Sequence, residues 1–458
     1  MIINLKKLCL LFTVLTLVFF SLSTSTLAAP IDDVRSYIKQ YYVDQVDSEI
    51  LNLPTIDEIL GKLDPYSTYF TSEEYGEFLD SLNQSFVGVG ISLEASENGI
   101  FITRVIEGSP AEKAGLHAGD LIIEVNGQDV TSDSIEALMA KLKGKEGEQV
   151  ELTVLREGVK ITKSITRAKI TLPTVTSKML AGNVGYMSVA SFNESTILEM
   201  KKAMKRLSGA VHWIVDLQHN PGGYVYVAQE MVGMFPQTTN SLIVETRHES
   251  TTYKAIKQDV TFSDSVDLLV NRYSASASEI VAGAVKDANA ATLYGETTFG
   301  KGLMQSLLTL PNNDVLKLTT ARFYTPNHHT IQEVGITPHI ETNRPLGLAH
   351  RHFLVEQFDA YKELNSLTDV PVSKEFTVSL SKPYKPTSMT KDIIQLIQLG
   401  GDVVDIELDY VSPTKVKVIP KHDMISGGDY LLVIHPGWET LKSKSTSTTG
   451  SFIDISVK

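Results

Sequence analysis

Three serines, one lysine and one glutamine are the side chains whose types and spacing could do chemistry together. Ser274, Ser276 and Ser278 alternate with alanines, Lys301 lies in a glycine-rich segment (295–302), and Gln305 follows it. A serine is a weak nucleophile until a base takes its proton, and a lysine is a base only when burial or a nearby cation keeps it neutral. A glutamine amide can hold such an amine without adding a charge. Composition alone does not separate the three serines.

The elements around these residues favour a nucleophile at the start of a helix. The pattern predicts a buried strand over 268–270, a helix from about Ser276, and a second strand over 291–294 that leads into the glycine-rich segment. The first backbone N–H groups of a helix have no partner within the helix, and they can stabilise a negative charge on oxygen. Taken alone, the pairing of a serine with a lysine is a weak signal, because serine-alanine runs are common in turns and most lysines are solvated.

The full residue pattern of this stretch narrows the choice among the three serines. S-A-S-A-S-E, followed by F-G-K-G-x-x-Q, resembles the C-terminal processing peptidases, also called tail-specific proteases. The resemblance implies that Ser276 is the nucleophile, Lys301 the general base and Gln305 its positioner, and it implies no cofactor. Glu279 and Asp287, on the same predicted helix, are interpreted as structural or peptide-contacting. The histidines form no metal-binding pattern, so no metal site is predicted.

A second glycine-containing segment follows another predicted strand. Residues 216–223 read D-L-Q-H-N-P-G-G and precede a predicted helix over 224–234. Such a junction presents backbone N–H groups at a helix start. The family resemblance implies that Gly222 or Gly223 supplies one oxyanion-hole N–H and Ala277 the other. The family usually has arginine where this chain has Gln218, so a buried charge is missing or replaced, and reduced activity is one expected consequence.

Residues 84–168 resemble a PDZ domain. The run F-V-G-V-G-I resembles the carboxylate-binding loop of that domain, in which the backbone of Val87, Gly88, Val89 and Gly90 would hold the terminal carboxylate of a peptide. An amphipathic helix over 132–142 is expected to line the groove. The resemblance therefore implies that the partners are protein or peptide substrates with exposed C-termini, bound as an added strand.

The chain is too long for one core and is expected to be a multidomain α/β and β protein. Its remaining parts are a signal peptide (1–28), an N-terminal helical region (29–83), a Ser/Lys protease core of the tail-specific type (169–350), a helix with a linker (351–374) and an Ig-like β-sandwich (375–458). Short alternating strands between Pro and Gly turns indicate the sandwich. The N-terminal helices either form a homodimer, as the family resemblance implies, or only cover the core.

The N-terminus has the features of a cleavable export signal. Lys6 and Lys7 precede an apolar run over 8–22, and small residues at 26–28 form a cleavage site. We therefore expect an exported protein, extracellular or associated with the cell envelope. The single cysteine, Cys9, lies inside this signal, so the mature chain would contain no disulfide. A formal net charge of −13 disfavours nucleic acid as a partner.

Two classes of function follow from these observations. The first is a secreted serine endopeptidase that recognises substrate C-termini through a PDZ domain and cleaves through an acyl-enzyme. The second is a catalytically weak or inactive PDZ and Ig-like peptide-binding scaffold at the cell surface. The serine, lysine and glutamine favour the first class, whereas Gln218 and the C-terminal module favour the second. His219, beside the glycines, is the histidine placed for a rival serine-histidine pairing.

Overall fold

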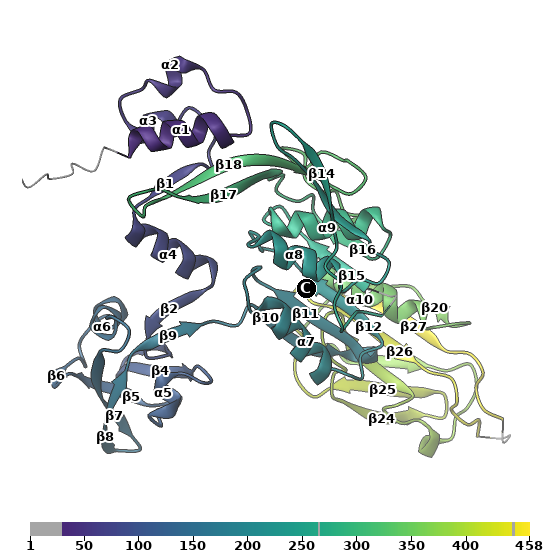
Figure 1. Ribbon diagram of the computed structural model, residues 1–458. Coiled ribbons are helices and arrows are strands. Elements are labelled where there is room, and N and C mark those ends of the chain that lie inside the picture. Colours follow the sequence, from purple (N-terminus) through teal and green to yellow (C-terminus); the bar gives the residue numbers. More distant parts are fainter. Residues whose placement is uncertain (1–29, 264–265, 442–444) are drawn as a thin grey trace, which may run out of the picture. The chain divides into compact units, whose positions relative to one another are not determined.

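The computed structural model describes residues 30–263, 266–441 and 445–458 (Figure 1). The predicted signal peptide, 1–28, lies outside these residues. Residues 30–75 with 305–320 form one compact unit, and residues 76–304 with 321–458 form a second. Within the described ranges, no helix combines the length and the apolar character that crossing a bilayer requires.

The first unit packs three short helices against a strand pair. The helices are α1 (Ile31–Tyr41), α2 (Ser48–Leu51) and α3 (Ile56–Leu60), and β1 (Thr68–Phe70) runs antiparallel to the start of β18 (Val315–Tyr324). Val34 and Ile38 lie one helical turn apart, so both face the core, where they meet Leu316. All three helices lie within the helical region predicted over 29–83.

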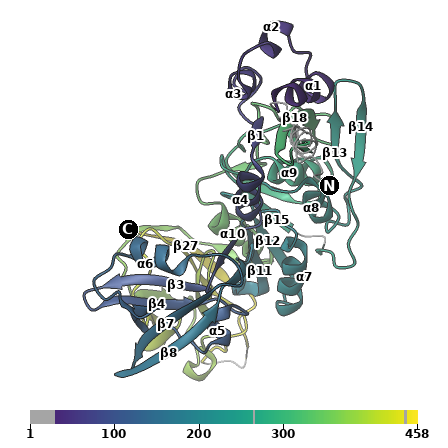
Figure 2. The same ribbon diagram turned by 60° about the vertical axis from the view of Figure 1, so that its left-hand side comes forward.

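The PDZ-like region is a sheet with a helix beside its first strand. Its strands are β3 (Ile91–Ser96), β4 (Gly99–Val105), β5 (Leu121–Val125), β7 (Gln149–Arg156) and β8 (Val159–Thr166), hydrogen-bonded in that order. Val150, Leu152 and Val154 alternate along β7 and are all buried. Helix α6 (Ile135–Leu142) lies beside β3 (Figure 2). The strands β2 (Ser85–Gly88) and β9 (Ala168–Thr171), which come before and after this sheet in the sequence, pair with each other in antiparallel fashion.

A mostly parallel six-stranded sheet carries the candidate catalytic residues. Its order is β10 (Val175–Leu180), β11 (Val184–Val189), β12 (His212–Asp216), β15 (Val266–Val270), β16 (Thr292–Gly295) and β19 (Ile340–Glu341), with only β10 antiparallel. The central strands of this sheet, β11, β12, β15 and β16, are rich in buried apolar residues, as expected for a sheet covered on both faces.

Different layers cover the two faces of this sheet. Val215 and Leu268 point into a core shared with α7 (Thr196–Arg206), α8 (Val225–Val232) and α9 (Ala277–Asp287). Their neighbours Ile214 and Leu269 point into a second core on the other face. The second core is completed by α10 (Pro345–Glu356) and by residues of the C-terminal region such as Leu431.

The C-terminal region contains two β-sheets around a core of its own. One sheet contains β20 (Lys362–Glu363), β27 (Ser451–Val457), β26 (Asp429–Ile434) and β23 (Ile394–Gln398), with β21 (Leu367–Val370) also on β27. The other contains β22 (Phe376–Ser379), β25 (Lys415–Pro420) and β24 (Ile406–Ser412). Along β26, Leu432 faces the core between these sheets, whereas Leu431 and Val433 face α10.

The prediction of a helix and linker over 351–374 is only partly right. The helix begins at Pro345 and ends at Glu356, where Pro345 occupies the first helical position. The rest of this range includes β20 and β21, which pair with β27 near the chain end. That pairing joins segments some ninety residues apart (Glu363 with Phe452), so local sequence does not reveal it.

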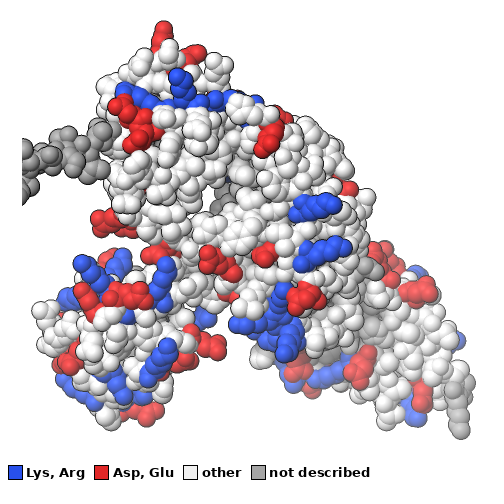
Figure 3. Space-filling model, viewed as in Figure 1, with Lys and Arg blue, Asp and Glu red and all other residues white. Residues whose placement is uncertain are grey.

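Charged side chains of both signs are interspersed over the face drawn in Figure 3. Among the described residues, many charged side chains form exposed pairs, such as Lys391 and Lys421 with Asp405 at 2.6 and 2.7 Å. Exposed pairs of this kind contribute little to stability because water and salt screen them. Stability must therefore come chiefly from the buried cores.

A fully buried histidine joins the mostly parallel six-stranded sheet to the C-terminal region. The Nε2 atom of His350 lies 2.8 Å from the carbonyl oxygen of Ala181, and the N–H of Gly400 donates to its Nδ1 at 2.9 Å. Only a neutral ring with its proton on Nε2 satisfies both partners. Burial lowers the pKa of His350 below its usual value, in agreement with a neutral ring.

This arrangement predicts a loss of stability in mild acid. Below about pH 6.5 the unfolded chain gains a proton on this residue and the folded chain does not, so the free energy of unfolding should fall by up to about 1.4 kcal/mol per pH unit and be flat above that range. The His350→Gln variant should lose this part of the slope in denaturant unfolding between pH 5 and 8. The exposed His422→Gln variant should keep the wild-type slope, and equal slopes in all three proteins would contradict the assignment.

Candidate active site

Ser276 occupies a strained position between a strand and a helix. It follows β15 through a short turn and is the residue before α9, with φ of 55° and ψ of −110°. Serine rarely adopts a positive φ, at a cost of about 1–3 kcal/mol, so surrounding contacts must hold it there. Its side chain is partly exposed, whereas Ser274 and Ser278 are fully buried.

The two neighbouring serines are engaged with buried backbone. The Ser274 hydroxyl donates to the carbonyl oxygen of Leu217 at 2.8 Å, and the Ser278 hydroxyl donates to that of Asn220 at 2.9 Å. Both tie the serine turn to the loop after β12. Burial and hydrogen bonding thus distinguish Ser276 from the two serines that composition could not separate from it.

The buried carboxylate of Glu279 connects the serine turn to the lysine loop. Its Oε2 accepts the N–H of Ser276 at 2.9 Å and the N–H of Lys301 at 2.8 Å. Because one oxygen binds both N–H groups, the two backbone nitrogens can be no further apart than the sum of these distances. Its Oε1 accepts the N–H of Gly300 at 2.7 Å and the Thr298 hydroxyl at 2.6 Å.

Two opposing effects act on the pKa of Glu279. Burial raises the pKa of this carboxyl, because a charge is costly in a dry environment, while the four donors favour the ionised form. Of the two roles predicted for Glu279, structural or peptide-contacting, these contacts correspond to the structural one. The sequence analysis did not predict that the Glu279 carboxylate binds the backbone of both Ser276 and Lys301. The S-A-S-E spacing is a capping-box pattern, which indicates the hydrogen bond between Ser276 and Glu279 but not the one between Lys301 and Glu279.

The glycine pair after β12 lies against the serine turn. Gly222 has φ of +107°, and a Cβ built on it would lie 2.9 Å from the Ala277 nitrogen and 2.9 Å from the Ser276 Cβ. Only glycine permits both this backbone conformation and this approach. The Gly222 N–H donates to Oδ1 of buried Asn220 at 2.9 Å. In the described part of the chain, neither the Gly223 N–H nor the Ala277 N–H forms such a bond.

Asn220 is a positioning residue that the sequence analysis did not single out. Its Nδ2 donates to the Val189 carbonyl oxygen at 2.8 Å, and its own carbonyl oxygen accepts the Ala275 N–H at 3.0 Å. With its Oδ1 on Gly222, it fixes the glycine pair, the end of β11 and the serine turn in one hydrogen-bond network. The N-P-G-G motif alone gives no indication of these partners.

Gln305 belongs to the first unit. Its Nε2 donates to the Thr319 hydroxyl at 3.1 Å, and that hydroxyl donates to Asp64 Oδ1 at 3.0 Å. Asp64 Oδ1 also accepts hydrogen bonds from the backbone N–H groups of Tyr66 and Ser67, in the loop just before β1. Gln305 is thus anchored by groups of its own unit, and its predicted role toward Lys301 stays a prediction.

The segment that contains Gln218 is held by neutral partners. Asp216 Oδ2 accepts the Tyr186 hydroxyl and Oδ1 the Gln218 N–H, both at 2.8 Å. Burial raises the pKa of Asp216. The His219 ring stacks on Tyr273 at 5.1 Å, and its Nε2 pairs with the Asn271 side chain at 3.0 Å. His219 is therefore engaged with Asn271 rather than forming the rival serine-histidine pairing.

The predicted peptide-binding loop borders a groove of about 760 Å³. Val87, Gly88, Val89 and Gly90 line it together with β3, α6 and the end of α4 (Ser72–Leu82). Gly90 has φ of +89°, and a Cβ there would lie 2.3 Å from the Ser109 Cβ, so this position requires glycine. Among the described residues, no group of three or more His, Cys, Asp or Glu side chains is arranged to hold a metal ion.

Comparisons with known proteins identify the family of this chain. A family model for peptidase family S41 matches residues 183–342, and one for the PDZ domain matches residues 78–155. The carboxy-terminal processing protease CtpA of Bacillus subtilis is 34% identical over 367 residues, which cover 79% of this chain and 78% of that protein. The chain belongs to the carboxy-terminal processing peptidases of family S41.

Two further similarities complete the comparison. A probable CtpA-like serine protease of Staphylococcus saprophyticus is 34% identical to this S41 chain over 321 residues, covering 69% of this chain and 65% of that protein. Among solved structures, the photosystem II D1 C-terminal processing protease covers 70% of this chain and 94% of its own, with 25% identity and a TM-score of 0.45. The identity to the Bacillus subtilis protease confirms the suspected family.

The Glu279 network makes a prediction about the stability of this S41 peptidase. A Glu279→Gln variant keeps the shape of the side chain but turns an amide NH₂ toward backbone donors that need an acceptor. We expect a loss of about 2–5 kcal/mol, measured by calorimetric and denaturant unfolding. The same change at the exposed Glu296, in the same glycine-rich loop, should stay within about 0.5 kcal/mol of wild type. Equal stability of the two variants would sink the proposed role of Glu279.

Proposed function

We propose that this chain is a secreted serine endopeptidase that binds substrate C-termini in its PDZ groove and cleaves through an acyl-enzyme. Ser276 is the nucleophile, Lys301 the general base and Gln305 the residue that positions the base. The observation that carries the proposal is the carboxylate of Glu279, which binds the backbone of Ser276 and that of Lys301 through a single oxygen. This contact holds a partly exposed serine and the lysine loop together.

The proposed reaction has two halves that use the same groups. Neutral Lys301 takes the hydroxyl proton of Ser276 as the oxygen attacks the peptide carbonyl carbon. The negative charge that develops on the carbonyl oxygen is met by backbone N–H groups of Ala277 and of the glycine pair. Gly223 is favoured over Gly222 as the second donor, because the Gly222 N–H is already bound to Asn220. Lys301 then protonates the leaving amine, and water releases the acyl group by the reverse path.

Two further parts of the proposal, export and the Ig-like sandwich, rest on the sequence and on local structure. Export follows from the charged, apolar and small-residue pattern of residues 1–28. An Ig-like sandwich over 375–458 is supported by the two sheets and the core between them. Dimerisation through the N-terminal helices and association with the cell envelope remain proposals without a described contact. The S41 relatives favour the peptidase over the alternative of an inactive scaffold.

The catalytic assignment predicts a sharp division among serine variants. Hydrolysis of a peptide with an apolar C-terminus should fall at least about a thousandfold in Ser276→Ala and in Lys301→Ala. Ser278→Ala, which removes a buried hydroxyl two residues away, should keep most of the activity after correction for folded protein. The wild-type kcat/KM should rise from mildly acidic to basic pH, because Lys301 acts only when neutral. Equal turnover in wild type and Ser276→Ala would contradict the assignment.

The PDZ groove has an apolar wall that limits which peptides it can take. Ile135, Met139 and Leu142 follow one another at intervals of four and three along α6, so they share the face that lines the groove. A peptide added beside β3 would place alternate side chains toward that helix. The last and the third-last residues of the substrate therefore meet apolar groups, and a polar side chain there would be buried without a partner.

This reasoning predicts the effect of changing the first of these helix residues. Ile135→Ser should weaken binding of a peptide with apolar last and third-last residues by about tenfold, measured by calorimetry on the catalytically inactive Ser276→Ala background. The exposed Val159→Ser, elsewhere in the same sheet, should leave binding unchanged. If a third-last serine binds as tightly as a third-last leucine in wild type, α6 does not select this position.

A further inference from the structure

A second pocket lies at the edge of the protease sheet opposite to Ser276. Its volume is about 460 Å³, and it is lined at the beginnings of β12, β15 and β16, by His212, Asp267 and Thr292. Ser276 and the glycine pair instead follow the carboxyl ends of β15 and β12. Because these strands are parallel, a molecule in this pocket would not touch the proposed catalytic residues. The volume falls in the range of roughly 300–1,000 Å³ that small-molecule sites occupy.

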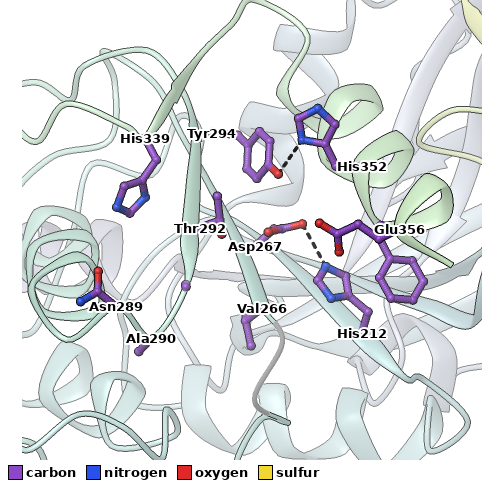
Figure 4. A pocket seen from close by; sticks show the side chains of 12 residues that line it. His212, Val266, Asp267, Asn289, Ala290, Thr292, Tyr294, His339, His352 and Glu356 are labelled. Atoms are coloured by element: carbon purple, nitrogen blue, oxygen red, sulfur yellow. Dashed lines mark hydrogen bonds and ion pairs between the residues drawn. The ribbon is translucent and has the colours of Figure 1, made fainter. Parts of the chain in front are cut away.

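The pocket contains polar pairs that a purely structural region would not need. His212 Nε2 lies 2.9 Å from Asp267 Oδ2, and both residues are less than a tenth exposed. The Tyr294 hydroxyl pairs with His352 Nδ1 at 2.9 Å, and His352 belongs to α10 (Figure 4). Polar groups at a buried edge are costly compared with packed apolar side chains, even when they are hydrogen-bonded. Their convergence on one cavity indicates a ligand.

The charge of the pocket indicates the sign of that ligand. The carboxylates of Asp267 and Glu356 extend into the same part of the cavity from β15 and α10 (Figure 4). Of the described residues that line it, none is Lys or Arg. Burial raises the pKa of Tyr294, and the two carboxylates raise it further, so both charges act on this hydroxyl.

We propose that this pocket binds a small organic cation whose ammonium or guanidinium group lies between Asp267 and Glu356. Such a group offers several N–H donors to two carboxylates and to the Tyr294 oxygen, and it neutralises their mutual repulsion. A metal ion is disfavoured, because the His, Asp and Glu side chains here form no group of three or more that could hold one. The ligand would join α10 to β15 and so stabilise the folded state.

Agmatine, which has a guanidinium group and an amine but no carboxylate, is a suitable probe for the full mature chain. We expect saturable binding in calorimetry and a rise in the thermal midpoint that equal ionic strength of sodium chloride does not produce. Glu356→Gln should weaken binding at least tenfold, and this exposed position allows the variant to fold. Asp359→Asn, an exposed carboxylate just beyond α10, should bind as wild type does.

Three outcomes would overturn the proposal. The first is the absence of saturable agmatine binding to the wild type, and the second is equal affinity in wild type and Glu356→Gln. The third is tighter binding of zinc chloride than of agmatine, lost in His352→Ala, which would show a metal site instead. None of these measurements uses peptide hydrolysis, so their results are independent of the proposed peptidase function.

Discussion

The structure around the active site depends on one buried carboxylate. Glu279 is fully buried and accepts hydrogen bonds from Ser276, Thr298, Gly300 and Lys301. A carboxylate in a dry environment is stable only while such donors remain in place, so the donors and the acceptor order one another. The helix that begins after Ser276 and the loop that carries Lys301 are thereby held to the same two oxygen atoms. The positive φ of Ser276 persists because its N–H is part of this network.

The sheet beneath this network determines what the rest of the chain can do. Its parallel strands send the serine turn, the glycine pair and the lysine loop to one edge, and they leave the polar pocket of His212 and Asp267 at the other. The alternation of Ile214 and Val215 gives the sheet two apolar faces, one for α7 to α9 and one for α10. Leu431 and Val433 of the C-terminal region complete the second face. That region is therefore part of the core that supports the sheet, and α10 is the element through which a ligand in the pocket would act.

Sequence reasoning succeeded where the determinants are local. The apolar run, the small residues after it and the glycine pair predict a strand, a turn and backbone donors at a helix start, which is how Ser276 and Gly222 are placed. Composition and periodicity could not rank Ser274, Ser276 and Ser278 without the family resemblance, because the partners of Ser274 and Ser278 lie near residue 220, more than fifty positions away. The partners of Glu279 at Thr298 and Gly300 depend on how a loop folds back, and the pairing of β20 and β21 depends on the chain end. In each failure the missing information was a contact between distant segments.

Gln218 illustrates how the structure changes the meaning of a departure from a family motif. From the motif alone, glutamine in place of the usual arginine means that a buried charge is missing or replaced, and reduced activity is one expected consequence. The carboxylate of Asp216 is instead satisfied by the Tyr186 hydroxyl and by a backbone N–H, neither of which carries a charge. Burial raises the pKa of Asp216, which further reduces the need for a cation. Two neutral donors and a carboxyl that ionises less readily form a stable arrangement. The substitution therefore gives no physical reason to regard the serine site as decayed.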